Sequence, residues 1–415
     1  MIKQKASVKF TLYQFILLYY LDRVHGNHLV NEIIRTDQSI IEDSTLDTFT
    51  LIRKYGYPCE IHRVYTEDKY ILEMHRVPHG INKTNNSRRP VIFLQHGLLS
   101  SSAEWVLMRP GKGLAYILAD AGYDVWMGNA RGNTYSRHHV STKPTKSQFW
   151  QFSWHEIGYY DLPAMIDYVL KDTGVTKVQY IGFSQGTTAF WVMASTRPEY
   201  NNKISAMHAL APIAFISHIK SPLIKTLGPF TNSLELVMKM LGANEFLPNG
   251  KINELAGEKL CLEEAVTQVL CKNLLFLICG FNNEQLNNTM LPVVLGHTPA
   301  GASTKQIIHF GQLYNSNKFV QFDYGRFKNR RIYGSRYPPS YNLTAITTPI
   351  FLHYADNDWL STPTDVHRLM LELPVVVGKY RVPMKAFNHL DFVFANDANK
   401  LIYNRLLNIM SQFVN

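Results

Sequence analysis

The stretch that decides the fold is Lys177-Val178-Gln179-Tyr180-Ile181-Gly182-Phe183-Ser184-Gln185-Gly186. Residues 177–181 predict a strand and residues 185–195 a helix, and the turn between them matches G-x-S-x-G. A serine on so tight a turn has a strained backbone and projects its Oγ outward, while Gly182 and Gly186 leave room where a Cβ would clash. The pattern therefore predicts a nucleophile at Ser184, against the alternative of an ordinary turn with two coincidental glycines.

Strands and helices alternate on both sides of this turn. Further strands are predicted at 91–95, 124–127, 204–210, 350–354 and around Val382. Further helices are predicted at about 113–121, 160–170 and 364–373. Alternation of this kind favours an α/β fold with a mainly parallel sheet and helices on both faces.

The alternation stops between about residues 215 and 342. The segment contains helical patterns at 234–241 and 263–278 that are rich in Leu, Met and Phe. An insertion of this size between two strands predicts a helical cap over the carboxyl edge of the sheet. We therefore expect a core formed by residues 27–214 and 343–415, with a cap at 215–342.

Composition narrows the class of protein. The chain has 415 residues, 46% hydrophobic and 18% charged, which excludes wholesale disorder. Its formal charge of +10 is spread thinly, and its densest basic clusters are Lys3 to Lys9, Arg88-Arg89 and Arg326 to Arg331. None of these clusters has a nucleic-acid-binding signature, so we expect no nucleic-acid partner. The charge indicates a solvated basic surface or, alternatively, contact with an anionic lipid surface.

The first 26 residues are typical of a signal peptide. Lys3, Lys5 and Lys9 precede a 12-residue mostly apolar run, Phe10 to Leu21, and a small residue, Gly26, follows nearby. At roughly 20 residues per span the run is too short for an ordinary membrane helix, although it could be an N-terminal helix packed on the core. The sequons at Asn82, Asn85, Asn287 and Asn342 are glycosylation candidates that fit a secreted protein.

A serine hydroxyl needs a base to remove its proton and an acid to orient that base. In chains with a G-x-S-x-G elbow the order is Ser, then acid, then His. His389 is the best base, because it lies in a loop just after a predicted strand, whereas His353 lies inside a strand, His367 on a helix and His309 in the cap. Asp356 and Asp358 both follow the strand at 350–354, and spacing alone does not separate them.

Two backbone N–H groups are the predicted oxyanion donors. They belong to Gln185, at the start of the helix after the nucleophile, and to Leu98, in the loop after the strand at 91–95. We expect no metal and no cofactor. His155-Glu156 begins a zinc-protease motif, but Tyr159 stands where a second histidine is required, and no P-loop or dinucleotide fingerprint is present.

These residues stand in stretches that closely resemble the acid lipase family of gastric lipase, lysosomal acid lipase and their insect relatives. The resemblance spans about Val30 to the C-terminus, and the matching stretches are 93–99, 118–133, 160–164, 182–186, 275–281, 341–344 and 388–392. It implies an α/β-hydrolase core with a helical cap and a lid near Pro248 to Gly280. It implies secretion or a lysosomal location, and hydrolysis of triacylglycerols or steryl esters at a lipid–water interface, often at acidic pH.

The resemblance also assigns residues. The family's nucleophile falls on Ser184, its histidine on His389 and its acid on Asp358, although Ala355-Asp356 stands where the family has two glycines. The family's cap disulfide falls on Cys261 and Cys271, spaced one residue wider than in the family's pattern. The alternative for these two cysteines and Cys279 is that all three are buried thiols.

Two other functions compete with a lipase that acts through a serine acyl-enzyme. One is a lipid carrier that has kept the fold and lost catalysis, because a fold alone does not fix a function. The other is a different serine hydrolase, such as a peptidase, an amidase or a short-chain esterase. The helical residues Leu274 to Ile278 are candidates for an apolar substrate groove, or alternatively for plain core packing.

Overall fold

The computed structural model describes residues 38–82, 88–250, 261 and 267–413. The predicted signal peptide, the sequon at Asn85 and part of the predicted lid lie outside these residues. No helix among the described residues has the length and apolar character needed to cross a bilayer.

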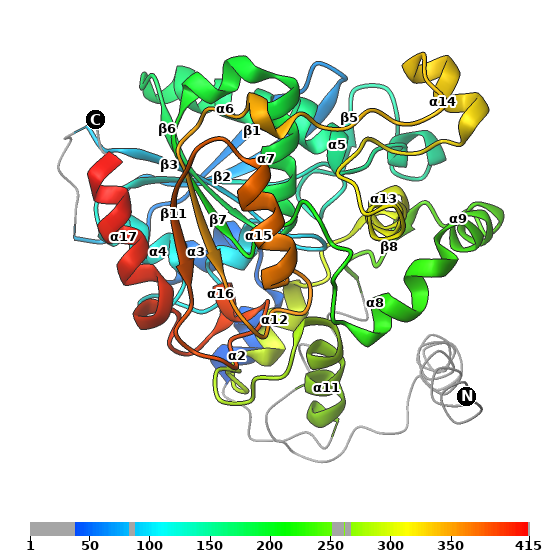
Figure 1. Ribbon diagram of the computed structural model, residues 1–415. Coiled ribbons are helices and arrows are strands. Elements are labelled where there is room, and N and C mark those ends of the chain that lie inside the picture. Colours follow the sequence, from blue (N-terminus) through cyan, green and yellow to red (C-terminus); the bar gives the residue numbers. More distant parts are fainter. Residues whose placement is uncertain (1–37, 83–87, 251–260, 262–266, 414–415) are drawn as a thin grey trace. The chain divides into compact units, whose positions relative to one another are not determined.

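A mainly parallel sheet forms the centre of the described chain (Figure 1). Its strands are β1 Glu60–Tyr65, β2 Tyr70–Val77, β3 Val91–Gln95, β4 Asp124–Gly128, β5 His138–His139, β6 Val178–Phe183, β7 Ile204–Leu210, β10 Ile350–Tyr354 and β11 Val376–Arg381. Their order is β1-β2-β4-β3-β6-β7-β10-β11, with β5 paired to β2. Strands β3, β4, β6, β7, β10 and β11 run parallel, whereas β1 and β5 pair antiparallel with β2, and β2 pairs antiparallel with β4.

Helices cover both faces of the sheet. The helices of the core are α2 Gln38–Thr45, α3 Thr48–Lys54, α4 Leu114–Asp120, α5 Trp154–Glu156, α6 Leu162–Thr173, α7 Gln185–Thr196, α15 Pro363–Glu372, α16 Asp391–Phe394 and α17 Asn404–Met410. Short 3-10 or π turns extend several of them: η1 Ser102–Trp105, η2 Ser147–Trp150, η3 Ile157–Asp161, η4 Pro198–Lys203, η7 Leu343–Ala345, η8 Asn399–Tyr403 and η9 Ser411–Phe413.

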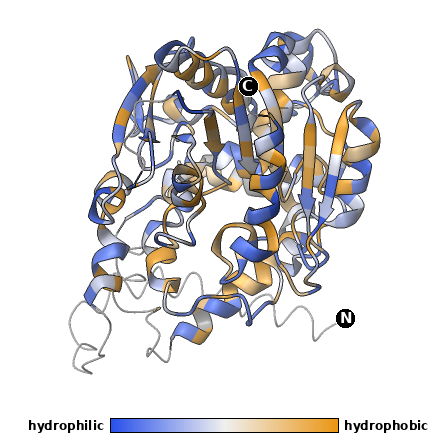
Figure 2. Ribbon diagram, turned by 90° about the vertical axis from the view of Figure 1, so that its left-hand side faces the viewer, coloured by the Kyte–Doolittle hydropathy of each residue, from blue (hydrophilic) through white to orange (hydrophobic). Residues whose placement is uncertain are grey.

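The central strands have apolar side chains on both faces of the sheet, so each face needs a layer of helices to bury them. Val91 and Phe93 of β3 belong to the buried cluster that includes residues of α6, α7 and α15, while Ile92 and Leu94 of the same strand belong to the cluster that includes residues of α3, α4 and α17. Side chains of a strand point alternately to opposite faces, so a strand that is apolar at every position must be buried on both. Hydrophobic and hydrophilic segments alternate along the covering helices, as expected of helices with one face on the sheet (Figure 2).

The inserted segment, residues 215–342, lies between β7 and β10. Its helices are α8 Pro222–Leu227, α9 Thr231–Met240, α11 Gln268–Cys279, α12 Leu291–His297, α13 Thr304–Ser316 and α14 Arg326–Tyr333, with the turn η5 Gly228–Phe230. A small antiparallel pair, β8 Glu245–Phe246 and β9 Ala302–Ser303, joins two parts of the segment. The described part of the segment is mainly helical, as the sequence predicted.

The predicted elements agree closely with the observed ones. The strands predicted at 91–95, 204–210 and 350–354 coincide with β3, β7 and β10. The strand predicted around Val382 ends one residue earlier, at Arg381. Strands β1, β2 and β5 were not predicted, because they form an antiparallel edge outside the alternation of parallel strands and helices.

Candidate active site

The turn between β6 and α7 has the geometry of a nucleophile elbow. Ser184 has φ 51° and ψ −118°, a strained conformation that costs on the order of 1–3 kcal/mol. A Cβ on Gly186 would lie 2.2 Å from the Gln95 carbonyl oxygen, and a Cβ on Gly182 would lie 2.9 Å from the Gly186 carbonyl. Both positions therefore require glycine, because backbone atoms that cannot move aside occupy the space.

Neighbouring groups hold this strained turn in place. The Ser184 N–H donates to the Leu210 carbonyl at the end of β7 (3.0 Å), and the Ser184 carbonyl accepts from the Thr187 N–H (2.9 Å) and hydroxyl (2.7 Å). The Thr187 hydroxyl also accepts from the Ile213 N–H (2.8 Å). These bonds fix the serine at the carboxyl edge of the sheet, where its side chain is 7% exposed.

The structure brings Ser184, His389 and Asp358 into one hydrogen-bonded chain. His389 Nε2 lies 2.9 Å from Ser184 Oγ, and His389 Nδ1 lies 2.8 and 3.0 Å from the two Asp358 carboxylate oxygens. The Asp358 side chain is fully buried, and its Oδ1 also accepts from the Leu360 N–H (2.9 Å) and the Ser361 N–H (2.7 Å). The acid thus orients the imidazole, and the imidazole faces the hydroxyl.

The other acid and histidine candidates lie elsewhere. Asp356 pairs with Arg381 at the surface. His353 and His309 are buried, His309 in a stack on Trp154, and His367 is exposed on α15. Of the two carboxylates, Asp358 is therefore the one that contacts His389.

The loop after β3 lies against the nucleophile. A Cβ built on Gly97 would lie 3.4 Å from the Ser184 Cβ and 3.2 Å from the Phe183 ring. His96 fixes the start of the loop, because its Nδ1–H donates to the Gly97 carbonyl (2.7 Å) and its Nε2 accepts from the Ala130 N–H (3.1 Å). Burial lowers the pKa of His96 to about 4, so this histidine is neutral and has a single tautomer that fits both bonds.

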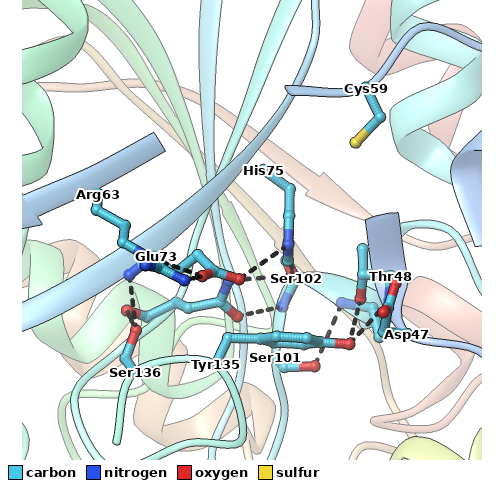
Figure 3. Close-up of polar contacts among 12 residues, drawn as sticks. Asp47, Thr48, Cys59, Arg63, Glu73, His75, Ser101, Ser102, Tyr135 and Ser136 are labelled. Atoms are coloured by element: carbon cyan, nitrogen blue, oxygen red, sulfur yellow. Dashed lines mark hydrogen bonds and ion pairs between the residues drawn. The ribbon is translucent and has the colours of Figure 1, made fainter. Parts of the chain in front are cut away.

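Glu104 is a buried group near this loop that sequence reasoning missed. Both of its carboxyl oxygens lie 3.4 Å from the Gly97 nitrogen, and the residue is only 4% exposed. Burial raises the pKa of Glu104 to about 8, against a smaller lowering by Ser100 and the Gly97 N–H. The preceding residues are also anchored: Ser102 N donates to Asn129 Oδ1 (2.8 Å), and Ser102 Oγ lies 2.7 Å from His75 Nδ1 (Figure 3).

The end of α11 joins the acid loop to the histidine loop. The Cys279 carbonyl accepts from the N–H groups of Trp359 (3.3 Å) and His389 (3.4 Å), and the Gly280 carbonyl accepts from Asn388 Nδ2 (3.0 Å). Asn357 Nδ2 in turn donates to the Phe281 carbonyl (2.8 Å). The sequence marked residues 275–281 through the family resemblance and Leu274 to Ile278 as a candidate apolar groove. It did not predict these contacts of the carboxyl end of α11.

Asp391 stabilises the loop that contains Asn388 and His389. Its Oδ2 accepts from the Asn388 N–H (2.7 Å) and from Asn282 Nδ2 (2.6 Å). Burial, with a smaller contribution from the nearby Asp358 charge, raises the pKa of Asp391 to about 7 despite these two donors. Burial also raises the pKa of the neighbouring Cys279 thiol, so this thiol is not activated.

An apolar pocket lies beside the same loop. It is lined by side chains of α11, α12 and the segment that follows His389, among them Leu275, Phe276, Leu291, Val294, Leu390 and Phe394. Two of the predicted groove residues, Leu275 and Phe276, are therefore pocket-lining residues. The inserted segment also contacts the elbow directly, because Gln185 Nε2 donates to Gln306 Oε1 of α13 (2.8 Å).

The remaining candidates concern covalent modification. Cys261 and Cys271 form a disulfide, and Cys59 and Cys279 are buried free thiols. Asn82 and Asn342 are exposed, whereas Asn287 is half-buried at the pocket and accepts from the Met290 N–H (3.2 Å).

Comparisons with known proteins agree with this geometry. Residues 90–395 match the model of the alpha/beta hydrolase fold family, and residues 48–109 match the partial alpha/beta-hydrolase lipase region. Lipase 3 of Drosophila melanogaster is 47% identical over 358 residues, covering 86% of this chain and 91% of the relative. Gastric triacylglycerol lipase of Homo sapiens is 41% identical over 370 residues, covering 89% and 92%.

A solved structure shares the fold at low identity. It is a lipase candidate from Sulfolobus solfataricus with a TM-score of 0.55 and 14% identity, covering 85% of this chain and 94% of that chain. At this identity the likeness shows the fold alone.

Proposed function

This chain belongs to the α/β-hydrolase lipase family and is a carboxylic ester hydrolase, and from that premise we propose that it cleaves neutral lipid esters through a Ser184 acyl-enzyme. The observation that carries the proposal is the continuous chain from Ser184 Oγ through His389 to the buried Asp358 carboxylate. A lipid carrier that had lost catalysis would have no need for this series of hydrogen-bonded side chains.

Each side chain has one task in the reaction. His389 Nε2 takes the Ser184 proton as Oγ attacks the ester carbonyl carbon, and Asp358 stabilises the imidazolium that forms. His389 then protonates the leaving alcohol as the C–O bond breaks. A water molecule, deprotonated by His389, attacks the acyl-enzyme, and the fatty acid leaves as Ser184 regains its proton.

The oxyanion is held by the backbone N–H groups of Leu98 and Gln185. The position of the Gly97 loop against Ser184 supports this assignment, as does the place of Gln185 at the first turn of α7. Neither N–H donates to another group among the residues that the structure describes. Both donors are therefore available to a developing negative charge.

The substrate is a triacylglycerol or a steryl ester presented at a lipid–water interface. This choice is supported by a relative of 41% identity that is named a triacylglycerol lipase, and by the apolar side chains that line the space between α11, α12 and the residues flanking His389. Residues 215–342 act as a cap over the site, with a lid near Pro248 to Gly280, between core parts 27–214 and 343–415.

The enzyme works in an oxidising compartment, either outside the cell or in the lysosome. The Cys261–Cys271 disulfide and the exposed sequons Asn82 and Asn342 support this location, and residues 1–26 serve as the signal peptide. No cofactor and no nucleic acid takes part in the reaction.

The test compares wild type with Ser184→Ala on a long-chain triacylglycerol emulsion, a steryl ester emulsion and a soluble p-nitrophenyl ester. We expect the variant to stay folded and to lose kcat by on the order of 10⁶-fold on every ester. A fluorophosphonate probe should label wild type at Ser184 and leave the variant unlabelled. Retained hydrolysis in the variant would exclude the mechanism, and a wild-type preference for the soluble ester without activation by an interface would exclude the lipid substrate.

A further inference from the structure

Helix α14 and the loop after it form a strongly basic projection of the inserted segment. Residues 324–341 contain five cationic residues and no acidic residue, which is half of the formal charge of the chain. All five are exposed, and they are Arg326, Lys328, Arg330, Arg331 and Arg336. We call these residues, together with Phe327, Ile332 and Tyr337, the α14 patch.

The cations of the α14 patch are free of ion pairs among the residues that the structure describes, in contrast to Arg76, Arg131 or Arg197, each of which binds at least two carboxylates. Lys328 lies over the Tyr324 ring, 4.8 Å from its centroid, so it is held by an aromatic ring of its own loop. The positive charge is therefore not neutralised within the described chain.

Large apolar side chains stand among these charges. Phe327 is 97% exposed, Tyr337 67% and Ile332 46%. Phe327, Arg330 and Arg331 are three and four residues apart on a helix, so an apolar ring and two guanidinium groups share one face. A merely solvated basic surface explains the charges and leaves the exposed phenylalanine unexplained.

The helix is held firmly by its own loop. Asn329 is buried, and its side chain donates to Asp323 Oδ1 (2.7 Å) and to the Arg336 carbonyl (3.0 Å). The Tyr333 hydroxyl donates to the Phe322 carbonyl (2.9 Å). Figure 1 shows α14 at the outer end of the inserted segment, beyond α13. The helix therefore presents a preformed surface, at no cost in ordering it.

We propose that the α14 patch docks this enzyme on an anionic phospholipid surface, such as the coat of a lipid particle. Arginine suits lipid phosphates because its planar guanidinium can bind two oxygens at once. A basic surface with exposed aromatic residues is the physical pattern of proteins that lie on membranes. The inference rests on the proposed function in one respect, namely that a lipid surface is where the substrate is found.

The test is co-sedimentation with phosphatidylcholine vesicles that contain phosphatidylglycerol, against vesicles of phosphatidylcholine alone. Wild type should bind the anionic vesicles in a salt-dependent manner and bind the neutral vesicles far less. Arg330→Gln/Arg331→Gln should weaken binding to the anionic vesicles roughly 30-fold, at about 1 kcal/mol for each cation near such a surface. Phe327→Ser should weaken it as well, through loss of the inserted ring.

Matched controls separate the patch from net charge and general hydrophobicity. Lys171→Gln/Lys177→Gln removes the same charge from exposed cations near the end of α6, and Leu371→Ser removes an apolar side chain that is 82% exposed on α15. Both controls should bind as wild type does. Equal losses in controls and patch variants would overturn the proposal, as would wild-type affinity for heparin or RNA with none for the anionic vesicles.

The two proposals fail in different ways. Ser184→Ala should keep vesicle binding and lose hydrolysis, whereas Arg330→Gln/Arg331→Gln should keep hydrolysis of a soluble ester and lose vesicle binding. Loss of soluble-ester hydrolysis in the patch variant together with a disturbed circular dichroism spectrum would show a structural role for α14 and contradict the docking role.

Discussion

Two carboxylates only two residues apart have different surroundings. Asp358 is fully buried and contacts His389, while Asp356 lies at the surface with Arg381. We expect Asp358→Asn to lower kcat by roughly 10³–10⁴-fold, because the amide no longer fixes the imidazole tautomer or stabilises the imidazolium. Asp356→Asn should change kcat little and cost at most about 1 kcal/mol of stability, the range for an exposed pair. Turnover of a soluble ester, with circular dichroism to confirm folding, measures both. Equal losses in the two variants would contradict the assignment.

The sequence could not make this distinction from spacing. Both residues follow the same strand, and only the direction of the chain after Ala355 decides which carboxylate turns inward. Ser184 was different, because its strand, turn and helix are all local features of residues 177–195. Glu104 was missed for the opposite reason, since it lies seven residues beyond Gly97 on an ordinary turn with no motif around it.

At the scale of elements, the carboxyl end of α11 sets the distance between the acid loop and the histidine loop. Gly280 has φ +111°, and a Cβ there would lie 2.3 Å from the Asn357 carbonyl oxygen and 3.2 Å from the Asn388 Cβ. Gly280→Ala should therefore displace both loops, lower kcat, and reduce the free energy of unfolding by about 2–5 kcal/mol, the combined cost of overpacking and a left-handed alanine.

Gly174 is the matched control for this prediction. It ends α6 with φ +68°, and a Cβ there would meet nothing within 4 Å. Gly174→Ala should cost about 1–2 kcal/mol for the backbone alone and leave kcat unchanged. Urea unfolding and soluble-ester kinetics test the pair, and a kcat for Gly280→Ala equal to that of wild type would refute the role given to α11.

The sequence predicted α11 as a helix with a candidate apolar groove, and it did not predict the contacts of this helix with the loops that contain Asp358 and His389. Its helical pattern is local, but its bonds to the loops that contain Asp358 and His389 join residues up to 110 positions apart along the chain, for example His389 N to the Cys279 carbonyl. The sheet was easier to predict, because short, mostly apolar runs indicate strands that are buried on both faces, and this indication does not depend on knowing the partner strand. The antiparallel edge β1–β2, with alternating exposure in β1, gave no such signal within the parallel pattern.

At the scale of the whole molecule, buried carboxyls and buried histidines have opposite effects on the free energy of unfolding as the pH changes. Burial raises the pKa of Glu104 to about 8 and of Asp391 to about 7, so the folded state holds protons that the unfolded state has released. Stability contributed by these carboxyls is lost as pH rises from about 4.5 to 8. These two carboxyls therefore stabilise the folded state more at acidic than at alkaline pH.

Buried histidines set the acid limit. Burial lowers the pKa of His96 to about 4 and of His309 and His353 to about 3, and lowers that of His208 as well, with a smaller effect of His353 on His208. Below about pH 6.5 these histidines are protonated in the unfolded state and stay neutral in the folded state. The free energy of unfolding therefore decreases as the pH is lowered. His208 and His353 lie on adjacent strands with ring centroids 6.1 Å apart, and no nitrogen of either has a hydrogen-bond partner in the described chain.

We therefore expect the free energy of unfolding to pass through a maximum near about pH 6.5, since buried carboxyls with a raised pKa dominate above it and buried histidines with a lowered pKa dominate below it. His353→Phe keeps an aromatic ring between His208 and Tyr380 and removes one proton acceptor from the unfolded state. Between about pH 6.5 and 5 it should reduce the loss of stability by roughly 2 kcal/mol, at about 1.4 kcal/mol per pH unit for one histidine. Urea unfolding at a series of pH values measures this slope. An acid limb as steep in His353→Phe as in wild type would show that the buried histidines do not set the acid limit.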